Sequence, residues 1–75
     1  MSALRCWVVI EHDDEGRILM VKAFEDKELA VASGEELVRQ IADGGIQSGD
    51  EAVEVFHRHH EWRGFSSGVS LVYSE

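Results

Sequence analysis

The chain has 75 residues and carries 15 acidic against 7 basic side chains, which gives a formal net charge of -8. This charge argues against direct binding of a nucleic-acid backbone, because such binding needs Lys and Arg against phosphate. The single cysteine, Cys6, excludes an internal disulfide, and no apolar run approaches the ~20 residues of a membrane helix.

The composition predicts one small folded domain over residues 1–75. Hydrophobic residues make up 44% of the chain, too many for a disordered protein. At this length folding buries only roughly 60–65% of the surface that the unfolded chain exposes, which leaves little room for an enclosed substrate cavity. The N-terminal residues turn polar too soon for a signal peptide, so we expect the protein in the cytoplasm.

A β-hairpin is predicted at the start of the chain. Residues 4–12 and 17–24 are rich in β-branched and aromatic residues, which favours two strands. Between them lies an Asp-Asp-Glu-Gly segment, in which Gly16 can adopt the left-handed conformation that a tight turn needs.

One helix is predicted next, over roughly 27–43. Asp26 can cap its start, apolar residues follow at helical spacing, and Gly44-Gly45 can end it. A second interpretation starts the helix at Ser33, with Ser33 and Glu36 as a capping box.

Two further strands complete the expected fold. After a connector over 46–50, residues 51–62 alternate and predict a third strand; 63–68 form a turn and 69–73 a fourth strand. The fold class is therefore α+β, in the order ββαββ, with a mainly antiparallel four-stranded sheet and one helix packed on one face.

Histidines on the predicted third strand suggest an alternative function. His57, His59 and Glu61 would share one face of that strand, about 6.5 Å apart, and two histidines so placed can bind one zinc ion. Cys6 and His12 are the other good donors, on a different strand and its end, and no recognised zinc spacing is present. A metal-binding or metal-sensing domain using His57 and His59 is thus the second hypothesis; otherwise no cofactor or metal is expected.

No recognisable catalytic signature is present. Cys6 lies in an apolar strand, where an inert buried thiol is expected. Ser66 and Ser67 can be grouped with His60, but they lack the local sequence of a known nucleophile. We therefore expect no enzymatic activity and assign no catalytic residue.

Acidic clusters and aromatic residues near the C-terminal hairpin indicate protein binding instead. Carboxylates suit a basic partner surface, and aromatic residues are enriched in binding hot spots. The predicted partner-binding residues are Asp13, Asp14, Glu15, Glu35, Glu36, Trp62 and Phe65.

Three features occur together in this chain: the hairpin with its Asp-Asp-Glu-Gly turn, Phe24-Glu25-Asp26 leading into an amphipathic helix, and a second hairpin. In these features the chain resembles a class of very short, acidic, phage-type proteins, and several type I anti-CRISPR proteins are similar in length, acidity and compact build. If the chain is phage-encoded, the cytoplasm in which we expect it is that of the host cell. The resemblance implies a non-catalytic inhibitor that binds a Cas subunit or effector complex and blocks target DNA binding. The likeness is one of format, so no binding residue is carried over from it.

A homodimer is a further hypothesis. The predicted fourth strand, 69–73, contains no charge. At a sheet edge it would invite pairing with a second copy, whereas in the middle of the sheet its apolar character needs no other explanation. Repulsion between two acidic chains opposes the dimer, although salt screens it.

Overall fold

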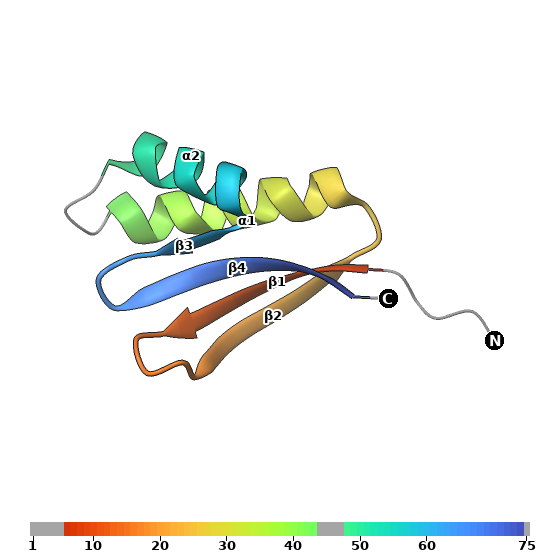
Figure 1. The fold of residues 1–75 in the computed structure, drawn as a ribbon, viewed down its shortest axis with the longest axis horizontal. Helices are drawn as coiled ribbons and strands as arrows, with labels where there is room; N and C mark the ends of the chain where they lie inside the picture. The colour runs from red at the N-terminus through yellow and green to blue at the C-terminus, as the bar shows by residue number, and fades with distance from the viewer. Residues whose placement is uncertain (1–5, 44–47, 75) are drawn as a thin grey trace.

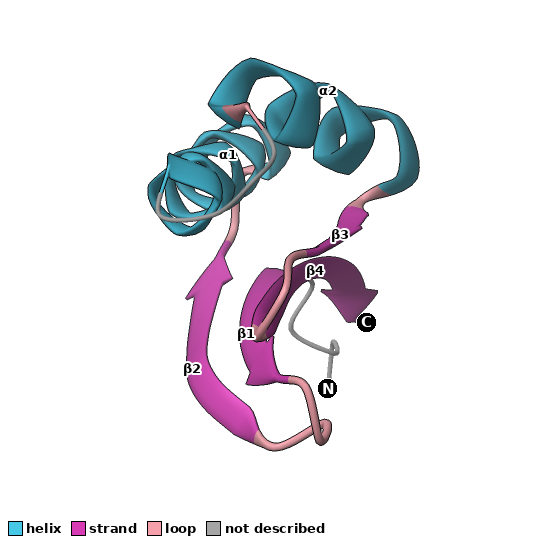
Figure 2. Ribbon diagram, turned by 90° about the vertical axis from the view of Figure 1, so that its left-hand side faces the viewer, coloured by secondary structure: helices cyan, strands magenta, loops and turns pink. Residues whose placement is uncertain are grey.

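The computed structural model describes residues 6–43 and 48–74. Its elements are β1 (Cys6–Asp13), β2 (Ile18–Phe24), α1 (Lys27–Asp43), α2 (Gly49–His59), β3 (Glu61–Arg63) and β4 (Ser67–Ser74). Within these residues four strands form one antiparallel sheet in the order β2-β1-β4-β3, and both helices lie on the same side of it (Figures 1 and 2). The α+β class and the antiparallel sheet are confirmed, but the order ββαββ with one helix is wrong.

The β1–β2 hairpin forms as predicted. Asp13 Oδ1 accepts hydrogen bonds from the backbone N–H groups of Glu15 (2.9 Å) and Arg17 (2.8 Å). Gly16 has φ 86°, the left-handed conformation that the turn requires. Residues 4 and 5 of the predicted strand lie outside the described residues.

Helix α1 has the predicted bounds. Asp26 Oδ1 accepts a hydrogen bond from the N–H of Glu28 at 2.8 Å, which satisfies one of the donors at the helix start. The alternative start at Ser33 is wrong, because the helix runs without a break from Lys27. The predicted end at Gly44-Gly45 lies outside the described residues.

The predicted third strand over 51–62 is wrong, since most of it is helix α2. Ser48 is the N-cap, and its hydroxyl accepts a hydrogen bond from the N–H of Glu51 at 3.2 Å. Gly49, Ala52 and Phe56 are buried at helical spacing, so burial follows a helix period. The helix ends at a left-handed residue, and only the three-residue β3 follows as a strand.

Replacing Ser48 with alanine tests this cap. The variant removes the acceptor for the Glu51 N–H, so we expect the free energy of unfolding to fall by about 0.5–2 kcal/mol. Urea unfolding followed by circular dichroism measures the change. Ser66→Ala, in the exposed turn before β4, is the control and should change stability by less than about 0.5 kcal/mol. Equal effects of the two variants would contradict a capping role.

The core lies between the two helices and one face of the sheet. Its buried hydrophobic residues are Val9, Ala30, Val38, Ala42, Ala52, Phe56, Trp62, Val69 and Leu71. Phe56 of α2 packs directly against α1 at Gly34, where a Cβ atom would lie 2.4 Å from Phe56 Cζ. The absence of a side chain at this position therefore lets the two helices approach each other.

Strand alternation decides which side chains face the helices. Trp7 and Val9 of β1 lie on the helix side. The centres of the Trp7 and Tyr73 rings are 4.6 Å apart, and Lys27 Nζ lies 5.1 Å from the centre of the Trp7 ring. Their neighbours along the strand face away from the helices.

Strand β4 lies between β1 and β3 in the sheet, but β3 pairs only with Gly68–Ser70. The central position is therefore confirmed for the first part of 69–73, whereas Val72 and Tyr73 have only β1 as a strand neighbour among the described residues.

Candidate binding site at the hairpin end

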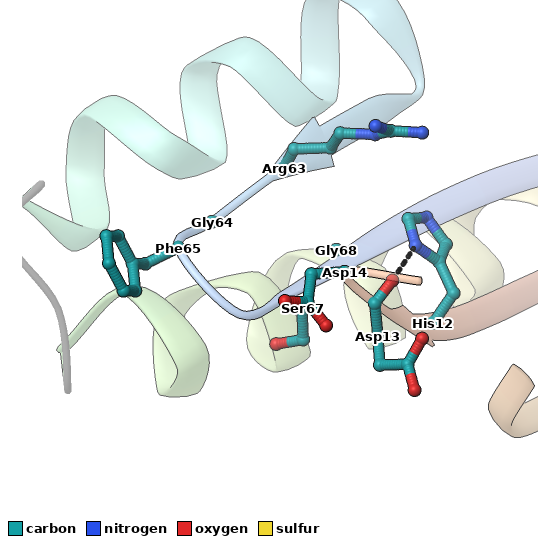
Figure 3. Close-up of a pocket in the computed structure, with 8 residues that line it drawn as sticks. All are labelled: His12, Asp13, Asp14, Arg63, Gly64, Phe65, Ser67 and Gly68. Atoms are coloured by element: carbon teal, nitrogen blue, oxygen red, sulfur yellow. Dashed lines mark hydrogen bonds between the residues drawn. The ribbon is translucent and has the colours of Figure 1, made fainter. Parts of the chain in front are cut away.

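The turns of both hairpins meet at one end of the sheet. Because β1 pairs with β4, His12 lies opposite Gly68 and Asp13 opposite Ser67. This brings the β1–β2 turn beside the β3–β4 turn, with an open depression of about 230 Å³ between them (Figure 3). The depression is lined by His12, Asp13, Asp14, Arg63, Gly64, Phe65, Ser67 and Gly68.

His12 and Gly68 shape the floor of this depression. His12 Nδ1 lies 3.4 Å from the carbonyl oxygen of Asp13, and its Nε2 lies 3.4 Å from Ser70 Oγ. A Cβ atom at Gly68 would lie 2.7 Å from His12 Cε1 and 3.3 Å from Arg63 Cγ. Glycine at this position therefore gives the imidazole and the arginine stem room on either side of β4.

The two predicted aromatic residues have opposite environments. Trp62 is buried, with 4% of its surface exposed, and its ring packs below Gly64, where a Cβ atom would lie 2.5 Å from it. Phe65 is 90% exposed and points away from His12 and Asp13 (Figure 3). Trp62 thus contributes to the core, and only Phe65 is available to a partner.

The three acidic residues predicted in the first turn also differ. Asp13 holds the turn, and its Oδ2 lies 3.2 Å from Arg17 Nε; Glu15 pairs with the same arginine. Asp14 is exposed and makes no ion pair within the described part of the chain. Asp14 therefore presents an available carboxylate at this end of the sheet, in a depression that is also lined by Arg63, whose exposed guanidinium lies 3.8 Å from Glu61.

Comparisons of the chain with protein-family models, with curated proteins and with solved structures found no match. The geometry of the hairpin end is thus the basis for the function proposed below.

The other two predicted acidic residues belong to the helix layer. Glu35 Oε1 lies 3.0 Å from His57 Nδ1, and Glu36 is exposed on α1. A second link between the helices joins Arg39 Nη1 to Asp50 Oδ1 at 2.7 Å. This hydrogen bond, and then the attraction of the Asp50 carboxylate, raises the pKa of Arg39 above its usual value. Neither Glu35 nor Glu36 lines the depression.

The geometry predicted for a zinc site is wrong. His57 and His59 lie on α2 rather than on a strand, and residues two apart on a helix point in nearly opposite directions. Across residues 6–43 and 48–74, no group of three or more His, Cys, Asp and Glu side chains could hold a metal ion. In the same residues no helix has the length and apolar character to cross a membrane.

Sequence reasoning did not find His12 and Arg63 as residues of this site. Each is polar and lies near a predicted turn, but only the pairing of β1 with β4 brings them to the same depression. One local signal was present: Gly68 adjoins the apolar run 69–73 and lies within β4, and a glycine in a strand often marks a close approach of other groups.

Proposed function

We propose that this chain is a non-catalytic protein-binding inhibitor, whose hairpin end engages a basic surface of another protein. The observation that carries the proposal is the exposure of Phe65, at 90%, on a depression that is also lined by the exposed carboxylate of Asp14. A phenylalanine this exposed adds nothing to the core, and buried aromatic anchors are typical of binding hot spots. The open shape of the depression supports a surface contact rather than the enclosure of a substrate.

The chemistry of the hairpin end favours an arginine on the partner. A guanidinium group can stack on an aromatic ring and can bind a carboxylate. Phe65 and Asp14 offer these two contacts from neighbouring turns. The formal net charge of -8 would also speed the encounter with a basic surface at low ionic strength.

A narrower proposal is that the partner is a Cas effector complex, which the chain would keep from its target DNA. It is supported by the resemblance in length, acidity and format to small anti-CRISPR proteins. Titration of the protein into a purified type I effector complex with labelled target DNA tests it directly. DNA binding should fall as the protein is added; unchanged DNA binding by several such complexes would leave only the broader proposal.

Two variants at the hairpin end test the broader proposal. We expect Phe65→Ala to weaken partner binding by at least about tenfold, the loss typical of a hot-spot aromatic residue. Asp14→Asn should weaken binding less than Phe65→Ala does. The difference in affinity between Asp14→Asn and the wild type should shrink as salt is added. Quantitative mass spectrometry of proteins captured from host lysate by the wild type and by each variant gives the first measurement, and titration with the purified partner gives the affinity.

The control for this experiment is Leu29→Ala. Leu29 is 61% exposed but lies on α1, outside the depression, so its replacement should leave binding unchanged. All three variants should unfold at nearly the wild-type urea concentration, because the replaced side chains are exposed. The proposal fails if every protein enriched by the wild type is enriched equally by Phe65→Ala.

A further inference from the structure

The sheet face opposite the helices carries an apolar patch. Alternation along the strands and the pairing register place its side chains on the side away from Val9. Three of them are largely exposed: Ile18 at 64%, Val21 at 53% and Val72 at 47%. The apolar patch consists of Val8, Ile10, Ile18, Val21, Ala23 and Val72.

This face is almost free of charge in a strongly acidic chain. Strands β1, β2 and β4 place no Asp, Glu, Lys or Arg on it within the described residues, since Glu11 and Lys22 share the helix side with Val9. The charges on it come from β3, where Glu61 and Arg63 lie 3.8 Å apart and balance each other. The carboxylates responsible for the net charge lie on the helix layer, at the turns and on the helix side of the sheet.

We infer that a second copy of this chain covers the apolar patch, in a homodimer whose two open sheet faces stack on each other. A two-fold axis places the same uncharged patch on both sides of the contact, so no charge is buried without a partner. Stacked sheets lie about 10 Å apart, with the two helix layers on the outer sides. The acidic helix layers are then more than about 20 Å apart, well beyond the Debye length of about 8 Å at physiological salt. A charged partner would find nothing on this face to attract it.

The size of the patch sets the strength of the dimer. Three strands about 4.8 Å apart, each with about seven residues at about 3.3 Å, cover roughly 15 by 23 Å. Two such faces bury on the order of 700 Å², which is less than the ~1,200–2,000 Å² of a standard stable interface. The dimer is therefore weak, and its population rises with protein concentration over the micromolar to millimolar range.

Sedimentation equilibrium at increasing protein concentration tests the inference. At moderate salt the average mass of the wild type should rise from one chain towards two, whereas Val21→Lys and Val72→Lys should stay at one chain throughout. Leu29→Lys is the matched control, because Leu29 is also largely exposed, at 61%, but lies on the helix layer, and it should associate like the wild type. A wild type that stays at one chain at millimolar concentration overturns the inference, and so does a Leu29→Lys variant that also stays at one chain.

Ile10 separates stacking of faces from pairing of edges. Strand β2 is a sheet edge, and among the described residues β3 pairs only with Gly68–Ser70 of β4, so Val21→Lys and Val72→Lys would also disturb a dimer built by pairing of edges. Ile10 belongs to the same apolar patch but lies on β1, which has β2 on one side and β4 on the other. An Ile10→Lys variant that is folded by circular dichroism and still dimerises overturns the stacking of faces. Phe65→Ala should dimerise like the wild type, so failure of this inference and failure of the proposed function are distinguishable.

Cys6 provides a measurement that needs no substitution on the patch. It is the only cysteine of the chain and lies on the same face as Val8, at the end of β1. A nitroxide label on Cys6 should give a dipolar signal between two chains that grows with protein concentration. Its absence at millimolar concentration overturns the inference even where Ile10→Lys does not fold.

Discussion

Replacing Phe56 with alanine is expected to lower the free energy of unfolding by about 3–5 kcal/mol, the usual loss for a buried phenylalanine. Phe56 is fully buried and packs against Gly34 of α1, so its removal leaves a cavity between the two helices. A domain this small has a total stability towards the lower part of the usual ~5–15 kcal/mol. We therefore expect a large unfolded fraction of Phe56→Ala at 25 °C.

Urea unfolding followed by circular dichroism measures this loss. Phe56→Leu, which keeps most of the buried volume, should remain folded and allow a full transition to be recorded. Val55→Ala is the control, because Val55 precedes Phe56 on the same helix but is 38% exposed. We expect Val55→Ala to lower the free energy of unfolding by well under half of the loss caused by Phe56→Ala. Similar losses for the two variants would mean that Phe56 does not hold the helices together.

Gly34→Ala is the second variant with a large expected effect, and two physical effects oppose each other in it. Alanine is favoured over glycine inside a helix by about 1 kcal/mol, which alone would stabilise the protein. The added Cβ atom would, however, lie 2.4 and 2.6 Å from Phe56 Cζ and Cε2. The Phe56 ring is fully buried, so helices α1 and α2 must move apart, at a typical cost of about 1–3 kcal/mol for overpacking. We expect a net destabilisation of about 1–2 kcal/mol.

A double-mutant cycle identifies the cause. If the clash with Phe56 is responsible, Gly34→Ala should cost less when Phe56 is already leucine, which gives a non-additive pair. Ala32→Gly, at an exposed position of the same helix, reports the propensity effect alone and should cost about 0.5–1 kcal/mol. A Gly34→Ala variant that is more stable than the wild type would contradict the close packing of the two helices.

The elements that could be predicted from the sequence are those with strong local signals. Alternating β-branched residues and Gly16 define the first hairpin, and Asp26 with a long apolar stripe defines α1. These signals depend on neighbours along the chain, so no knowledge of the tertiary fold is needed to read them.

Helix α2 was missed because a short apolar run fits two periods. In residues 51–56 the apolar positions can be read as an alternation or as one side of a helix. The sequence contains a signal that decides between them: Ser48 and Glu51 have the spacing of a capping box, and the serine does cap the helix. Assigning residues 57–61 to a strand then placed the histidines on one face, which produced the hypothesis of a zinc site.

The hairpin end could be predicted only as separate pieces. Asp13, Asp14 and Phe65 were chosen for their chemistry, and the structure brings all three to one depression. What brings them together is the pairing of β1 with β4, which no local pattern encodes. The burial of Trp62 depends in the same way on the placement of β3 beside α2.

The pairing of β1 with β4 also determines when the protein can fold. Cys6 lies opposite Ser74, so the middle of the sheet joins strands from distant parts of the chain. Closing so long a loop costs entropy before any contact across the pair forms, which slows folding. During synthesis β1 has only β2 beside it until β4 has left the ribosome, and Val9 lacks its neighbour Leu71 for all of that time. The sheet is therefore completed only once β4 has left the ribosome, and nascent chains that have not yet released β4 expose apolar surface to which chaperones can bind.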